Sequence, residues 1–359
     1  MKLRNLQFAF VAVLAATLGQ AALAQAPAAK KVPNVVILAT GGTIAGAAAT
    51  GTQSGYTSGA VTIDAMLKAV PGIDKLATVK GEQIANVGSQ DMSFDILLKV
   101  AKRINELAAG AGTDGFVITH GTDTLEESAF FLNLTVKTNK PVVIVGSMRP
   151  STAVSADGPL NLYNAVGVAV DPAAKGRGVL VVMNDVIQGA HSLTKTSTTS
   201  VETFQSPLRG VVGTANYGKN DWYQKPEWKH TTASEFDISK VTTLPRVDVV
   251  FAGVSADGAM IDAAVAKGAK GIVIAGVGNG NMTKAMVDAA SAAVKKGVVV
   301  VRASRVPTGL VGRNVELDDD KLGFVASDEL NPQKARILLA LALLSKRTPE
   351  NLQALYRTY

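Results

Sequence analysis

The stretch that decides the fold is NVVILATGGTIAG, residues 34–46. Its first six residues form a short apolar run, which predicts a buried β-strand. The run leads directly into Thr-Gly-Gly-Thr, so Thr43 is expected just beyond the carboxyl end of that strand. Ligands bind at this end of the strands in open α/β sheets, and glycines let the backbone approach a ligand closely. The stretch therefore predicts a candidate site at Thr43.

Two other interpretations of this glycine turn exist. A phosphate-binding loop would need either G-x-x-x-x-G-K-[ST] or G-x-G-x-x-G, and the sequence has neither spacing here. A plain turn without a ligand is the second interpretation, and these residues alone leave it open.

Short apolar runs recur along the chain and alternate with helical periodicity. This alternation predicts an α/β fold with a mainly parallel sheet flanked by helices. Ser93 is predicted to cap an amphipathic helix over residues 93–109, and Asn331 followed by proline is predicted to cap another. The predicted strands cover residues 34–39, 115–119, 142–145, 179–183, 247–251, 272–275 and 298–301.

The α/β alternation breaks at residues 216–244, which are polar and aromatic. We therefore predict a larger N-terminal α/β domain over residues 32–223, a linker over 224–245 and a smaller C-terminal α/β domain over 246–359. The 359 residues are 47% hydrophobic, which is enough to build cores of this size.

The N-terminus has the pattern of an export signal. Basic residues precede an uncharged run that ends in small residues, so residues 1–24 are predicted to be a signal peptide, cleaved after Ala24 or Ala26. An uncleaved anchor is the alternative, although the apolar core is short for a spanning helix. We expect a periplasmic protein that does not stay in the membrane.

Composition also limits the chemistry. The chain has no cysteine, which excludes disulfides, cysteine nucleophiles and thiolate metal sites. Its three histidines lie far apart in the sequence, so neither a metal nor a cofactor is expected. The net charge of +7 comes from scattered lysines, which does not indicate nucleic acid as a partner.

A second strand ends in polar residues at THGTDTLEE, residues 119–127. Thr124 and Glu127 match the capping box T-x-x-E, which places Thr122 and Asp123 at a helix N-terminus. The free amides there favour negative charge, either a substrate carboxylate or the oxyanion of a tetrahedral intermediate. The alternative is that Asp123 serves only as a helix cap.

A threonine hydroxyl becomes a nucleophile only when a neighbouring base takes its proton. Lys195, in the hydroxyl-rich segment after the strand at 179–183, is one candidate base, although a lone lysine is more often solvated. Tyr56 is another. It lies in the Gly/Ser/Thr-rich residues 47–60, a composition typical of a mobile lid or of an ordinary loop.

Together the motifs resemble a known family. TGGTIAG at 40–46 and HGTDTLEES at 120–128 resemble the signature segments of the bacterial L-asparaginases. With the export signal, the resemblance implies the exported type II branch, two α/β domains and a homotetramer built from tight dimers. Further similarity lies at residues 81–93, 146–165, 194–199, 276–282 and 324–336.

The resemblance also implies catalytic roles. Thr43 would be the primary nucleophile, with Tyr56 and Glu316 completing its triad. Thr122, Lys195 and Asp123 would form a second triad. Attack by Thr43 on the side-chain amide of asparagine would give an acyl-enzyme and ammonia, and water would then release aspartate.

Substrate contacts follow from the same resemblance. Ser89 and Gln90 would hold the α-carboxylate and α-amino group, and Asp123 would pair with the ammonium. Asn281 and Glu316 would reach the site from a neighbouring subunit. Residues 188–192 lack the Arg-Asp pair common in the family, but they include no matched catalytic position.

Three other functions are weighed. A mixed glutaminase-asparaginase differs by one substrate methylene, and Asn281 favours asparagine because strong glutaminases tend to carry serine there. A periplasmic amino-acid-binding protein would share the two domains and the signal peptide but would not need Thr43, Tyr56 and Lys195. An adhesion protein has no specific support in the sequence.

Overall fold

A computed structural model describes residues 32–53 and 55–359. The predicted signal peptide lies outside the described residues. Within them, no helix is both long and apolar enough to cross a membrane.

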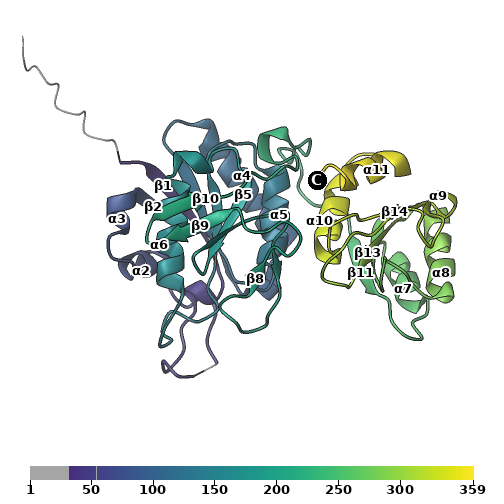
Figure 1. Ribbon diagram of the computed structural model, residues 1–359, viewed down its shortest axis with the longest axis horizontal. Coiled ribbons are helices and arrows are strands. Elements are labelled where there is room, and N and C mark those ends of the chain that lie inside the picture. The colour runs from purple at the N-terminus through teal and green to yellow at the C-terminus, as the bar shows by residue number, and fades with distance from the viewer. Residues whose placement is uncertain (1–31, 54) are drawn as a thin grey trace, which may run out of the picture. The chain divides into compact units, whose positions relative to one another are not determined.

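The larger sheet has eight strands in the order β10-β9-β6-β5-β4-β3-β1-β2. Figure 1 labels β1, β2, β5, β9 and β10 of this sheet. Strands β1 to β5 pair in parallel, and the remaining three add an antiparallel edge. The mainly parallel sheet predicted from the sequence is confirmed. The strands are β1 (Asn34–Gly41), β2 (Thr78–Val87), β3 (Gly115–Thr119), β4 (Val142–Val145), β5 (Val179–Met183), β6 (Val186–Gly189), β9 (Gly213–Asn216) and β10 (Lys219–Trp222).

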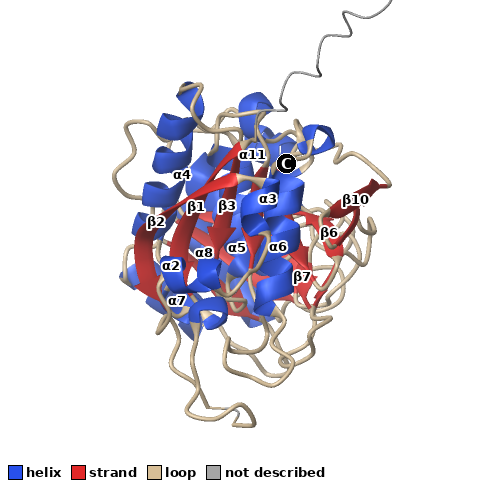
Figure 2. Cartoon of the chain, turned by 90° about the vertical axis from the view of Figure 1, so that its left-hand side faces the viewer, coloured by secondary structure: helices blue, strands red, loops and turns tan. Residues whose placement is uncertain are grey.

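Helices cover both faces of this sheet because successive strand residues point to opposite faces. Leu38 and Phe116 pack under α4 (Phe94–Ala109) and α5 (Leu125–Thr135). Ile37 and Val117 pack on the other face, where α3 and α6 lie in front of the strands in Figure 2. The helices of that face are α2 (Ile63–Lys68), α3 (Ile73–Leu76) and α6 (Gly158–Ala169).

The smaller sheet has four parallel strands in the order β11-β12-β13-β14. Helices α7 and α8 cover one face, and α10 packs between the other face and α5. The elements are β11 (Val247–Phe251), α7 (Ala259–Ala266), β12 (Gly271–Gly276), α8 (Lys284–Lys295), β13 (Val299–Ser304), α9 (Asp319–Leu322), β14 (Phe324–Ala326), α10 (Pro332–Ala342) and α11 (Pro349–Tyr356).

Two predicted helix caps are confirmed. The Ser93 side chain accepts from Ile96 N at the start of α4, and the Asn331 side chain accepts from Lys334 N at the start of α10. Across residues 223–246, all of which the structure describes, the only regular element is the 3-10 helix η4 (Thr231–Ala233). The domain bounds given above remain a prediction.

Candidate active site

Thr43 lies where the sequence predicts it, immediately after β1. Gly41 and Gly42 have φ of 101° and 84°, which favour glycine, and they turn the chain into the 3-10 helix η1 (Thr43–Ala45). The Thr43 hydroxyl is 2.6 Å from the Tyr56 hydroxyl. The two side chains therefore form a hydrogen-bonded pair at the carboxyl edge of the sheet.

Backbone contacts hold Tyr56 beside this turn. Ala47 and Thr57 form an antiparallel bridge, so Tyr56, the residue before Thr57, is held at the base of the loop. A Cβ on Gly46 would lie 2.8 Å from the Tyr56 ring, so glycine is needed there for the ring to fit. Tyr56 nevertheless remains 42% exposed, which leaves it open to a ligand or to another chain.

A second hydroxyl cluster lies after β3. Lys195 Nζ donates to Thr122 Oγ1 at 3.0 Å and to Asp123 Oδ1 at 2.7 Å. Lys195 belongs to the short strand β7 (Thr194–Lys195), which pairs with β8 (Phe204–Gln205). Lys195 therefore meets two adjacent residues that lie 73 and 72 positions before it in the sequence.

The two glycine turns contact each other through their backbones. A Cβ on Gly42 would lie 2.2 Å from Gly121 N, and one on Gly121 would lie 3.0 Å from Gly42 Cα. Gly42 is predicted to let the backbone approach a ligand, and in the structure it lets its own turn approach the turn at Gly121. Their contact brings Thr43 and Thr122 to one edge of the sheet.

A buried histidine supports the second turn. His120 Nδ1 lies 2.6 Å from the Gly121 carbonyl, and its Nε2 lies 2.8 Å from Ser128 Oγ. The carbonyl can only accept, so Nδ1 carries the proton and Ser128 donates to Nε2. Burial lowers the pKa of His120 to about 4, and its bond to Gly121 acts in the opposite direction. His120 is therefore neutral at pH 7.

The predicted capping box at Thr124 is wrong. The Thr124 side chain makes no cap bond to α5 and instead donates to Ser89 O at 2.7 Å. Asp123 N, the amide just before the cap residue Thr124, donates to Ser89 Oγ at 3.0 Å. Tertiary contacts with the 3-10 helix η2 (Ser89–Asp91) therefore replace the local cap. Thr122 and Asp123 still precede α5, as predicted.

The two clusters line one open cavity of about 450 Å³. Five predicted catalytic residues share its wall: Thr43, Tyr56, Thr122, Asp123 and Lys195. Ser89 is buried and does not line the cavity, whereas Gln90 is exposed and bonds to Asp91. Among the described residues, no group of three His, Cys, Asp or Glu side chains could hold a metal ion.

Two predicted site residues lie elsewhere, on loops of the smaller sheet. Asn281 Nδ2 donates to Glu316 Oε2 at 2.8 Å, and neither residue lines the cavity. The buried Arg302 holds both loops, because it pairs with Asp319 and donates to the carbonyls of Gly280 and Gly312. The sequence gives no signal for Arg302, because it follows an apolar run without any polar pattern.

Family models match both halves of the chain. The model described as "Asparaginase, N-terminal" matches residues 34–228, and "Glutaminase/Asparaginase C-terminal domain" matches residues 246–356. The chain belongs to the asparaginase family. It is an enzyme, an amidohydrolase.

Relatives in this family match almost the whole chain. "L-asparaginase 2" of Escherichia coli is 52% identical over 92% of this chain and 95% of that protein. "Probable L-asparaginase periplasmic" of Haemophilus influenzae is 51% identical over 91% and 93%. "Glutaminase-asparaginase" of Pseudomonas fluorescens is 45% identical over 92% and 91%.

A solved structure has the same fold. The probable cytoplasmic L-asparaginase from Campylobacter jejuni is 47% identical, with a TM-score of 0.89 over 91% of this chain and 100% of that one. Members of the family therefore carry names that differ in both substrate and cellular compartment.

Proposed function

We propose that this enzyme hydrolyses L-asparagine to L-aspartate and ammonia, with Thr43 as the nucleophile. One observation carries the proposal: two threonine hydroxyls on one cavity each contact a separate group that can exchange a proton. Thr43 contacts Tyr56 at 2.6 Å, and Thr122 contacts Lys195 at 3.0 Å. A two-step acyl transfer needs proton transfer both at the nucleophile and at the leaving group.

In the first step, Thr43 Oγ1 attacks the side-chain amide carbon. Its proton passes to the Tyr56 oxygen as Tyr56 releases its own proton toward Glu316 of the partner subunit. The C–N bond then breaks, and the leaving nitrogen takes a proton from the Thr122 hydroxyl, which Lys195 replenishes. The products of this step are ammonia and an aspartyl ester on Thr43.

In the second step, water attacks the ester carbon and gives a proton to Lys195 through the Thr122 hydroxyl. The Thr43 oxygen leaves with the proton that returns from Glu316 of the partner subunit through Tyr56, and aspartate is released. The oxyanion of each step forms beside the turn that precedes α5, where the backbone amides of Thr122 and Asp123 lie and the positive end of the helix dipole favours negative charge. Asp123 N is already bonded to Ser89, so the Thr122 amide is the candidate donor.

Opposite charges would orient the small zwitterionic substrate. Asp123 would pair with its ammonium group, and Gln90 would contact the same end of the molecule. Ser89 Oγ accepts from Asp123 N, so its own hydrogen remains to donate to the α-carboxylate. Asn281 would contact the substrate from a second copy, so a complete site needs at least two copies of the chain. The family resemblance supports a homotetramer with shared sites as the working assembly.

For location, we propose export to the periplasm. The pattern of residues 1–24 supports this proposal, and so does the name of the Haemophilus relative. Intact-mass measurement of the protein purified from the periplasmic fraction tests the cleavage. A protein that still carries residues 1–24 would contradict it.

Ammonia release with L-asparagine and with L-glutamine tests the activity. We expect rapid turnover of asparagine and a loss of at least about 1,000-fold in Thr43→Ala. Thr113→Ala is the control, because Thr113 is equally buried but precedes β3, at the opposite edge of the sheet.

Each result has a definite meaning. Comparable turnover of glutamine would make the protein a glutaminase-asparaginase, the alternative that the Pseudomonas relative's name favours. No ammonia from either substrate would contradict the proposal and favour a binding protein. Normal turnover in Thr43→Ala would remove Thr43 from the mechanism.

A further inference from the structure

We infer that Lys334 is a positioning residue for Lys195: the N-terminus of α10 fixes the backbone that presents Lys195 to Thr122. The inference rests on the proposed role of Lys195 as a proton-transfer group. It assigns a function to a residue of the smaller domain that lies outside both triads and does not line the cavity.

The contacts of Lys334 are made to the backbone just before Lys195. Its Nζ donates to the His191 carbonyl at 2.7 Å and to the Leu193 carbonyl. These two carbonyls lie four and two residues before Lys195, so the ammonium group spans the segment that leads into β7. A shift of this segment would move Lys195 Nζ away from Thr122 Oγ1.

Lys334 is buried, and removing its ammonium group from water is unfavourable for folding. The residue is 2% exposed, and burial lowers its pKa to about 8, while Glu126 acts in the opposite direction. A buried lysine is normally destabilising unless its donors are satisfied. If this buried position needed only packing, leucine or methionine would stabilise the fold more than lysine. The two hydrogen bonds that Lys334 donates therefore explain why lysine is found here.

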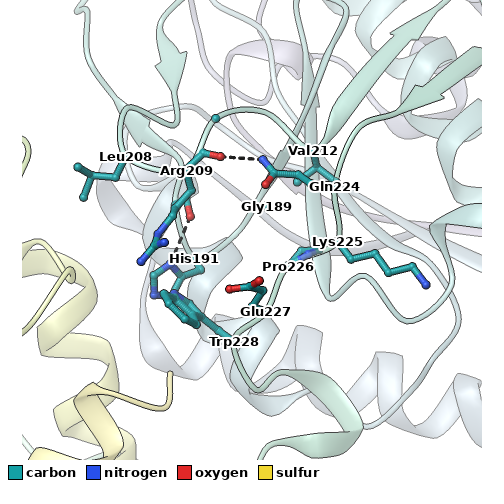
Figure 3. A pocket seen from close by; sticks show the side chains of 12 residues that line it. Gly189, His191, Leu208, Arg209, Val212, Gln224, Lys225, Pro226, Glu227 and Trp228 are labelled. Atoms are coloured by element: carbon teal, nitrogen blue, oxygen red, sulfur yellow. Dashed lines mark hydrogen bonds between the residues drawn. The ribbon is translucent and has the colours of Figure 1, made fainter.

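The same segment is held from its other side by aromatic packing. The His191 ring lies edge-on to Trp228 with centroids 4.8 Å apart, and the Arg209 guanidinium lies 4.9 Å from the Trp228 ring (Figure 3). A cavity of about 660 Å³ opens beside this stack. His191 is therefore fixed through its side chain here and through its carbonyl by Lys334.

Neighbours of Lys334 on α10 hold the first turn of α5, which follows Thr122 and Asp123. Gln333 Nε2 donates to Glu126 Oε1 at 2.7 Å, and Arg336 lies 3.6 Å from the Glu127 carboxylate. Glu126 is buried, so its bond to Gln333 also satisfies a desolvated carboxylate. One helix end therefore aligns both segments of the Thr122 cluster.

Lys334→Met tests the inference in the full-length mature enzyme. We expect kcat for asparagine to fall about 10- to 100-fold with KM changed less than about threefold, because a displacement of about 1 Å at a catalytic group costs on that order. Thr43 and the cavity wall around it would be unchanged.

Lys137→Met is the matched control. Lys137 Nζ also donates to two backbone carbonyls, those of Thr231 and Ser234 at 3.4 and 2.5 Å, but it follows the far end of α5. We expect Lys137→Met to lower thermal stability while kcat changes less than about twofold. Equal losses of kcat in both variants would overturn the inference in favour of a general effect on folding.

A double-mutant cycle separates positioning from a global effect. If Lys334 acts through Lys195, Lys334→Met should change kcat less than about twofold when Lys195 is already methionine. An undiminished 10- to 100-fold loss in the Lys195→Met background would overturn the inference.

Two further outcomes keep the test decisive. If Lys334→Met does not fold, Lys334→Gln takes its place. Its neutral side chain is one bond shorter and cannot span both carbonyls, so normal kcat in that variant overturns the inference. If Lys195→Met itself retains normal kcat, the proposed second triad fails. If Lys195→Met is impaired and Lys334→Met is not, only the positioning role fails.

Discussion

The two hydroxyl clusters of the cavity are assembled over very different lengths of chain. Thr43 and Tyr56 are 13 residues apart, and the loop that joins them forms its own bridge. Thr122 and Lys195 are 73 residues apart, and the segment before Lys195 is held by Lys334, a further 139 residues along. The first cluster is local, and the second depends on the whole fold.

The exposure of the two proton-transfer groups differs in the same sense. Tyr56 is exposed on its loop, whereas Lys195 is half-buried and contacts two partners. A group on an exposed loop can close over a ligand, but a group fixed by distant contacts is preorganised before the ligand arrives. We therefore expect substitutions in the second cluster to lower kcat more than they raise KM.

The largest effect is expected for Lys195→Met. Loss of a proton-transfer group should lower kcat about 1,000-fold. Thermal stability should change little, because Asp123, its ion-pair partner, is 58% exposed and such pairs contribute at most about 1 kcal/mol. Steady-state kinetics and calorimetry check this against Lys284→Met, whose side chain is 87% exposed on α8. Near-normal kcat would remove Lys195 from the mechanism.

Acid should weaken the structure beneath the second cluster. Because the pKa of His120 is about 4 in the folded protein and 6.5 for an ordinary, solvated histidine, the unfolded chain binds more protons between these values. Neutral His120 makes its full contribution to stability above pH 6.5. As the pH falls toward 4, the free energy of unfolding decreases by about 3 kcal/mol.

Urea unfolding at pH 7.5 and 4.5, at one protein concentration, measures this loss. His120→Gln should be less stable at pH 7.5 but should lack most of the additional loss at pH 4.5. If the free energy of unfolding falls equally with pH in the wild-type protein and in His120→Gln, protonation of His120 does not cause the loss.

A smaller effect is expected where the two clusters meet. In Gly121→Ala the new Cβ would lie 2.7 Å from Ser89 Oγ and 3.0 Å from Gly42 Cα, so the turns must separate. A displacement of about 1 Å between the two clusters should lower kcat/KM about 100-fold. Gly112→Ala is the control, since no atom lies within 4 Å of its added Cβ. Equal activity of the two variants would contradict the need for this close contact.

The buried strands were predictable because their apolar runs are continuous. Runs at 115–119, 142–145, 179–183 and 247–251 coincide with β3, β4, β5 and β11. Strand β2 was missed because it lies at the sheet edge and alternates between partly buried and exposed residues. The antiparallel strands β6, β9 and β10 were missed because they are only four residues long and carry no apolar run.

For the site, the sequence by itself determined that Thr43 and Thr122 follow parallel strands, since strand ends and glycine turns are local features. It also supplied Tyr56 and Lys195 as candidate bases. Only the tertiary structure decided that Thr124 contacts Ser89 instead of capping α5, and that Lys334 and His120 support the second cluster. The physical reason is the distance along the chain over which each feature is specified. Local patterns encode a strand, a turn or a helix start, but the partner of a buried polar group is whichever distant group the packed fold brings to it.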